Sequence, residues 1–178
     1  MSDEIAQSDK LYDLDKISSE MVEFIDSFKS VIISSDLGEH CIVSYAPFVR
    51  EGDEIYILLS SIARHYQGIK HDPNKVQIIF LQDETLANSI FERKRVAFST
   101  KADILLDKNE FISKFENKFS DEVQFLMIKQ MEDFHIIRLK IGQGRFVKYA
   151  GVCFETDGLK VLKQLNEYLP HKIFANKD

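Results

Sequence analysis

Residues 54–60 read EIYILLS and residues 75–81 read KVQIIFL, two mostly apolar runs of strand length. Strands with one face in water alternate polar and apolar side chains, and these two runs alternate too little for that. We therefore expect both strands to be buried on two sides, inside a closed barrel or a barrel that packs on a partner.

Further short strands, separated by turns, lie on either side of these runs. Residues 31–33 and 41–45 flank the turn DLGE at 36–39, a pattern that predicts a β-hairpin. Pro47 predicts a sheet edge or a bulge, because proline cannot donate to a central ladder. The other predicted strands are 95–106, 133–140, 145–149 and 152–155, with a turn at Gly142 and Gly144.

Helical segments are predicted between and after the strands. Apolar spacing and capping residues (Ser18 or Ser19, 120–122 and Asp157) place them at 18–29, 62–70, 83–92, 108–130 and 157–168, with Pro170 after the last. Seven or eight short strands with few βαβ units predict an antiparallel barrel with peripheral helices, in the α+β class.

The chain has 178 residues, which fits one domain over 17–178 after a flexible, polar segment at 1–16. It carries 23 Lys and Arg against 29 Asp and Glu, and this acidic balance argues against nucleic acid as a partner. The two cysteines lack metal-site spacing, and no signal peptide or membrane-spanning apolar run is recognisable. We therefore expect a cytoplasmic protein with no membrane contact.

The segment SSIARH at 60–65 lies where a predicted strand passes into a predicted helix. Two hydroxyls, the first free amides of the helix and the Arg64 guanidinium would converge there on an anion. In the alternative interpretation, Ser61 simply caps the helix and Arg64 is solvated. Spacing alone favours neither interpretation.

Arg93, Lys94 and Arg95 enter the long predicted strand, where consecutive side chains point to alternate faces. Such a cationic triplet in an acidic protein is suited to hold a carboxylate or a phosphate. The equally common alternative is a charged gatekeeper beside a β-rich segment.

No pair among the five histidines has the HExxH spacing or a similar one, so we expect no structural zinc. Ser44, Cys41 and Cys153 lack a catalytic signature, and no Walker loop or GxGxxG occurs. His171 differs from the other histidines because it follows Pro170 beyond the last predicted helix, where a tail could swing over a site.

Several segments, taken in order, resemble one family. They are VSYAPF at 43–48, IARH at 62–65, QDET at 82–85, FERKR at 91–95, DF at 133–134 and GRFVK at 144–148. Together they are similar to the heme-utilization proteins of the HugZ/HutZ type, within the pyridoxamine-phosphate-oxidase-like FMN-binding split-barrel superfamily. The resemblance extends from about residue 18 to the C-terminus.

The resemblance implies a homodimer of antiparallel six-stranded split barrels with two sites at the subunit interface. It also implies O2-dependent opening of the heme macrocycle with iron release, with an electron donor as a further partner. His171 takes the role of the proximal ligand of the heme iron, and Asp133 that of the acid bonded to its other ring nitrogen. Arg93 matches the basic distal residue, and His65 matches the ARH histidine. The family has glycine before the ligand histidine, where this chain has Pro170.

Two alternatives remain open. Split barrels of the oxidase branch bind FMN at the same interface, and Ser61, Arg64, Lys70 and Arg95 would then hold its phosphate. A heme carrier or storage protein would instead bind heme through His171 without turnover.

Overall fold

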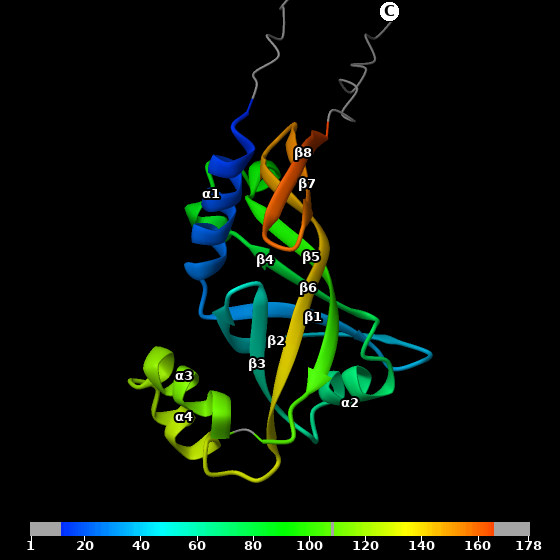
Figure 1. Ribbon diagram of the computed structural model, residues 1–178, viewed down its shortest axis with the longest axis vertical. Helices are drawn as coiled ribbons and strands as arrows, with labels where there is room; N and C mark the ends of the chain where they lie inside the picture. Colours follow the sequence, from blue (N-terminus) through cyan, green and yellow to red (C-terminus); the bar gives the residue numbers. More distant parts are fainter. Residues whose placement is uncertain (1–11, 108, 166–178) are drawn as a thin grey trace, which may run out of the picture.

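The computed structural model, which describes residues 12–107 and 109–165, contains one antiparallel sheet of eight strands (Figure 1). The strands are β1 (Ser30–Asp36), β2 (Cys41–Glu51), β3 (Glu54–Ser60), β4 (Val76–Leu81), β5 (Arg95–Ile104), β6 (Phe134–Tyr149), β7 (Val152–Asp157) and β8 (Lys160–Leu165). Their order in the sheet is β3-β2-β1-β4-β5-β6-β7-β8.

Strand β6 closes the sheet into a barrel, because it pairs with β3 as well as with β5. Strands β1 to β6 form the closed barrel, and β7 and β8 continue the sheet from the second half of β6. The predicted α+β class and the six-stranded antiparallel barrel are confirmed.

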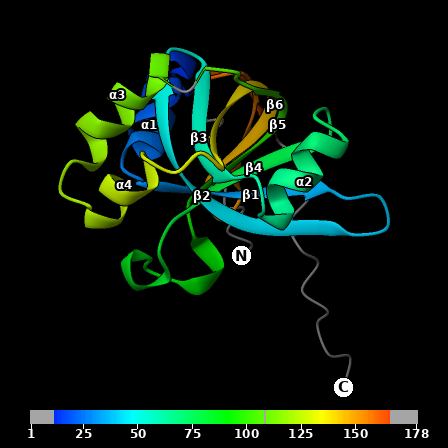
Figure 2. The ribbon, with the colours of Figure 1, turned by 90° about the horizontal axis from the view of Figure 1, so that it is seen from below.

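Helices and short helical turns surround the barrel. They are α1 (Leu14–Asp26), α2 (Arg64–His71), η1 (Glu84–Leu86), η2 (Ile90–Glu92), α3 (Asn109–Phe119) and α4 (Val123–Ile128). Seen from below, α2 and the α3–α4 pair lie on opposite sides of the barrel (Figure 2). The predicted helices at 62–70 and 108–130 and the helical turns at 83–92 are confirmed in place, with shorter bounds.

The burial of strand β3 explains why EIYILLS does not alternate between polar and apolar side chains. Ile55, Ile57 and Leu59 point into the barrel and belong to its main core. Tyr56 and Leu58 point outward and form a second core with Phe115, Phe119 and Phe125 of α3 and α4. Both faces of this strand are therefore buried within one chain, as the sequence predicted.

Strand β4 differs from β3 in this respect. Val76, Ile78 and Phe80 are buried inside the barrel, whereas Ile79 and Leu81 on the outer face are only half-buried. Burial of KVQIIFL on two sides is thus not achieved by one chain alone.

The helix predicted over 157–168 is wrong, since the chain returns there as strand β8. Gly158 has φ +56°, in the left-handed region that favours glycine, and turns the chain between β7 and β8. Pairing with β7 then buries Val161, which overrides the local helical pattern. Residues 166–168 lie outside the described part of the chain.

The turn predicted at Gly142 and Gly144 is also wrong, because β6 runs through both residues. Gly144 is instead required by close packing. A Cβ there would lie 2.3 Å from the Phe98 ring, 2.6 Å from the Ala97 carbonyl oxygen and 2.7 Å from the Thr156 hydroxyl.

Pro47 does not interrupt its strand, and of the predicted edge or bulge it is the edge that forms. Strand β2 pairs with β1 as far as Pro47 and with β3 only from Phe48 onward. Residues 41–47 therefore pair with β1 on one side only and form a sheet edge on the side where β3 pairs with the rest of β2. Proline is tolerated at such an edge.

The serine cap predicted for the first helix is replaced by an aspartate. Asp13 caps α1 by accepting the amides of Asp15 and Lys16, both at 3.1 Å, so the helix begins earlier than predicted. Ser18 lies within α1, and its hydroxyl accepts the Val161 amide of β8 at 2.9 Å. This bond joins the first helix to the last strand.

We expect Gly144→Ala to destabilise the fold by about 1–3 kcal/mol or more, because the added methyl group overlaps backbone and ring atoms that cannot move freely. Chemical denaturation measures the change. Gly142→Ala is the matched control, since its Cβ would meet only the Ser99 carbonyl oxygen, at 3.2 Å. Equal stability losses in the two variants would contradict the packing role of Gly144.

Candidate functional site

A hydroxyl–carboxylate pair lies where β3 ends and β6 begins. Ser60 Oγ donates to Oδ2 of Asp133 at 2.5 Å, and both side chains are half-buried. The Ser61 amide donates to the Asp133 carbonyl oxygen at 2.7 Å, so the backbone is fixed as well. The register that sets Ser60 opposite Phe134 brings these residues together.

His65 follows Ser60 closely in sequence and lies in the first turn of α2. The helix rests on β1 so tightly that a Cβ on Gly68 would lie 2.4 Å from the Ser35 hydroxyl, which donates to the His65 carbonyl at 3.1 Å. Burial lowers the pKa of His65 below its usual 6.5, so its imidazole is neutral at pH 7. The next residue, Tyr66, places its ring 5.4 Å from that of His135.

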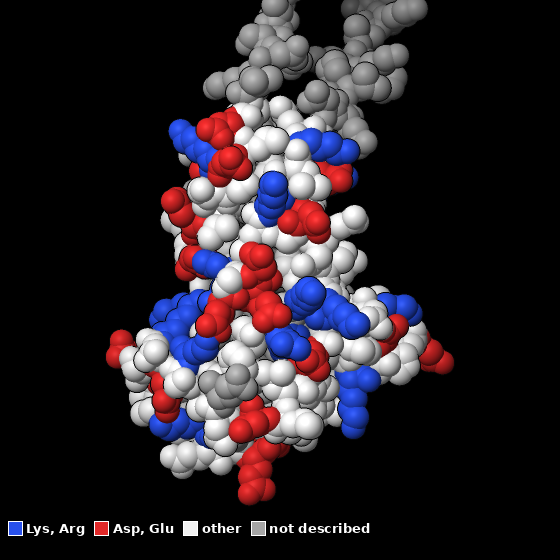
Figure 3. Space-filling view, in the orientation of Figure 1, with Lys and Arg blue, Asp and Glu red and all other residues white. Residues whose placement is uncertain are grey.

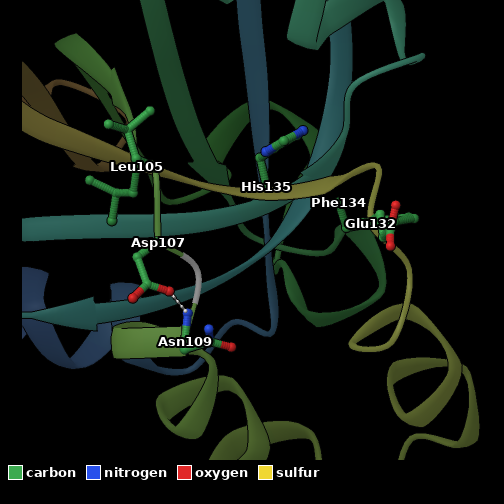
Figure 4. A pocket seen from close by; sticks show the side chains of 7 residues that line it. Leu105, Asp107, Asn109, Glu132, Phe134 and His135 are labelled. Atoms are coloured by element: carbon green, nitrogen blue, oxygen red, sulfur yellow. Dashed lines mark hydrogen bonds between the residues drawn. The ribbon is translucent and has the colours of Figure 1, made fainter.

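An open pocket of about 280 Å³ lies between the end of β5 and the start of β6 (Figure 4). Its lining mixes apolar, acidic and other polar side chains: Leu105, Leu106, Asp107, Asn109, Glu132, Phe134 and His135. Asp133 stands in the chain between two of these residues. Sites that enclose a cofactor usually exceed roughly 300 Å³ and bury most of the ligand, so this pocket alone is too small for a large one.

The cationic triplet lies at the other end of the barrel. Arg93 donates through Nε and Nη2 to the Gln82 carbonyl oxygen at 2.8 and 2.5 Å. Arg95 donates to the Arg93 carbonyl oxygen at 3.2 Å, whereas Lys94 Nζ lies 5.5 Å from the centre of the Phe24 ring. Lys94 thus faces α1.

Strand β6 separates the two groups of residues. Its ladders place Phe134 opposite Ser60 and Val147 opposite Arg95. At 3.3 Å per residue, the strand between these two pairs is roughly 43 Å long. Figure 1 shows β6 running from the lower to the upper part of the molecule. A single chain therefore brings Ser61 and Asp133 together but does not bring Arg93 or Arg95 to them.

The residues of the FMN alternative are divided in the same way. Ser61, Arg64 and Lys70 lie at or in α2, with Arg64 and Lys70 exposed, while Arg95 lies at the far end of β6. Ser61 does not cap the helix, because α2 has Ala63 at its N-cap and no side-chain capping bond. That part of the alternative for the SSIARH segment is wrong.

His171, the predicted iron ligand, and Pro170 lie outside the described residues. Within residues 12–107 and 109–165, no cluster of three or more His, Cys, Asp or Glu side chains could hold a metal ion. No helix in that part of the chain is long and apolar enough to cross a membrane.

No protein-family model matches the chain. Its sequence is 32% identical over 148 residues to a curated protein of Vibrio cholerae named heme oxygenase HutZ, and the match covers 80% of this chain and 82% of that protein. The chain belongs to the HutZ family. The predicted resemblance is thereby confirmed.

Solved structures of similar proteins agree with this assignment. Campylobacter jejuni ChuZ superposes with a TM-score of 0.79 at 32% identity, covering 85% of this chain and 63% of ChuZ. The chain thus spans less than two thirds of ChuZ. The structure described as HutZ, the heme storage protein from Vibrio cholerae, gives a TM-score of 0.63 at 31% identity, covering 70% of this chain and 89% of that one. A heme binding protein from Mycobacterium smegmatis, at 17% identity and a TM-score of 0.68, shares the fold; the match covers 79% of this chain and 57% of that one.

Charge is mixed on the face of this HutZ-family protein shown in Figure 3, where basic and acidic side chains lie interspersed over the barrel and helices. The face carries no continuous basic surface of the kind that binds a phosphate backbone. This distribution agrees with the acidic balance of the whole sequence.

Two contacts of the predicted site residues could not be predicted from the sequence. Ser60 belongs to the predicted anion-binding segment, but its bond to Asp133 depends on the pairing of β3 with β6, which are far apart in sequence. The acceptor of Arg93 is the main-chain carbonyl oxygen of Gln82, and a main-chain acceptor cannot be recognised from the residue type. Only the apolar run before Ser60 and the strand after Asp133 hinted that the two could pair.

We expect the free energy of unfolding to fall as pH drops below about 6.5, in part because of His65. Burial lowers the pKa of His65 in the folded state, so as the pH falls the unfolded state binds a proton before the folded state does. Acid therefore stabilises the unfolded state relative to the folded state. His65→Gln should therefore flatten the difference between urea midpoints at pH 7.5 and pH 5. His40→Gln, in the exposed β1–β2 turn, is the control. An unchanged pH dependence in His65→Gln would contradict the assignment.

Proposed function

We propose that this protein takes heme as its substrate and opens the macrocycle in an O2-dependent reaction that releases iron and needs an external electron donor. The identity to heme oxygenase HutZ supports this proposal. The half-buried Asp133 carboxylate, which Ser60 holds at the end of the barrel, supports it independently. An oriented carboxylate is the partner that a metal-ligating imidazole needs on its other ring nitrogen.

Each residue then has a defined task toward bound heme, which would supply the iron centre for oxygen chemistry. Asp133 accepts the N–H of the His171 imidazole, which fixes its tautomer and raises its basicity. Arg93 supplies guanidinium N–H donors where negative charge develops on oxygen. His65 presents a neutral imidazole near the Asp133 end of the barrel.

A homodimer is part of the proposal, and the chain length between the described end of β8 and His171 supports it. Leu165 pairs with Cys153, and Cys153 pairs with Val147 near the upper end of β6. Six residues lead from Leu165 to His171 and span at most roughly 22 Å, whereas the strand from Val147 back to Asp133 measures roughly 46 Å. The carboxylate of one chain would therefore meet the imidazole of a second.

An apolar row on the outside of the barrel offers a surface for this second copy. Tyr45, Ile32, Ile79 and Ala97 lie directly opposite one another across β2, β1, β4 and β5. Tyr45 is 70% exposed and Ile32 38% exposed in the single chain. A partner packed on this row would also complete the two-sided burial of β4.

We expect the wild-type protein to sediment as a dimer and Tyr45→Glu to shift it toward the monomer. A carboxylate placed in the apolar row must be desolvated when the subunits associate, which weakens association. Folding should be unaffected, because Tyr45 is largely exposed. Met127→Glu on α4, an apolar position of similar exposure (61%), is the control. A monomeric wild type, or a Tyr45→Glu variant as dimeric as the control, would contradict the proposed interface.

We expect added heme to give the wild-type protein a Soret band, and His171→Ala to weaken heme binding about tenfold or more and change the ligation spectrum, because the iron loses its imidazole. Titration followed by absorption spectroscopy measures both. His40→Ala, which removes an exposed histidine from the β1–β2 turn, should bind as the wild type does. Unaltered spectrum and affinity in His171→Ala would remove this residue from the site.

The same samples separate turnover from the alternatives. With ascorbate and O2, the Soret band should decay and iron should be released, and Arg93→Ala should slow this decay while heme still binds. A stable band would instead favour storage, the function in the description of the Vibrio cholerae HutZ structure. A yellow flavin that copurifies, with no heme binding, would favour the FMN alternative.

A further inference from the structure

Ser60 makes two hydrogen bonds that together orient one carboxylate. Its Oγ donates to Oδ2 of Asp133 at 2.5 Å and accepts the Ile62 amide at 3.3 Å. Because the amide occupies a lone pair of the hydroxyl oxygen, the hydroxyl proton is directed to the carboxylate.

The remaining contacts leave one carboxylate oxygen for another donor. The Ser61 amide binds the Asp133 main-chain carbonyl at 2.7 Å, which holds the residue in place without using its side chain. Of the two carboxylate oxygens of Asp133, only Oδ2 has a hydrogen-bond partner among the described residues. Oδ1 is therefore the oxygen that can accept an N–H from outside this group.

We propose that Ser60 is a positioning residue that sets how strongly Asp133 draws on the imidazole bound to heme iron, an inference that rests on the proposed function. A hydroxyl that donates to Oδ2 withdraws electron density from the carboxylate, so Oδ1 becomes a weaker acceptor. The imidazole keeps more of its own proton and donates less charge to the iron. Without the hydroxyl, the imidazole gains anionic character, which favours ferric over ferrous iron.

The test is the ferric/ferrous midpoint potential of the heme-loaded protein, measured by spectroelectrochemistry. Ser60→Ala should shift the redox equilibrium toward the ferric form by a factor of up to about ten, equivalent to ~59 mV for one electron. Ser60→Thr, which keeps the hydroxyl, should restore the wild-type potential. Ser34→Ala, which removes a half-buried strand serine elsewhere in the barrel, should leave the potential unchanged.

The outcomes separate this inference from the function on which it rests. An unchanged potential in Ser60→Ala, alongside a shifted one in Asp133→Asn, would overturn the role of Ser60 and leave the proposed function intact. If neither His171→Ala nor Asp133→Asn alters the heme spectrum, the proposed site fails and this inference fails with it. Should Ser60→Ala not fold, Ser60→Cys keeps a weak donor and should give an intermediate shift; a wild-type potential there would overturn the role.

Discussion

Closure of the barrel by β6 is the constraint on which the rest of the structure depends. This one strand pairs with β3 through its first residues, with β5 along most of its length and with β7 at its end. A strand that pairs with three neighbours must be long. Its length separates Asp133, just before its first residue, from Val147, which pairs with Arg95. It must also pass its neighbours closely, which is why Gly144 cannot carry a side chain. The distance between the two groups of candidate residues is thus a consequence of how the barrel closes.

The core of the fold was predictable where a strand is buried by its own chain. The segment EIYILLS at 54–60 places apolar side chains on both faces of its strand, which predicts burial on both faces. The structure buries both. The strand over 160–165 was predicted as a helix, because its burial comes from pairing with β7 and that partner is invisible in a local pattern. Gly142 and Gly144 suggested a turn for a similar reason, since close packing and chain reversal demand the same residue.

The candidate site was predictable in its residue types and less so in its contacts. Residue chemistry drew attention to Ser61 and Arg93, and the family resemblance to Asp133, but the distances between them follow from strand register, which no short segment records. The bond from Ser60 to Asp133 forms only because Ser60 ends β3 opposite the first residue of β6. The apolar row through Tyr45 likewise emerges only when four strands are set side by side. Pairing of distant strands is therefore the information that local sequence lacked.

Under the proposed function, the difference between heme turnover and heme storage would fall largely on one guanidinium. Arg93 is held through Nε and Nη2 by the Gln82 carbonyl, and its Nη1 lies 3.9 Å from the Glu84 carboxylate. A donor fixed before the substrate arrives needs no reorganisation when negative charge develops beside it. The Glu84 carboxylate competes for the same guanidinium, so under this proposal the segment that carries Gln82 and Glu84 would set how many Arg93 donors remain for heme chemistry. Storage requires no such control, because it leaves the charge on oxygen unchanged, whereas oxidative ring opening depends on it.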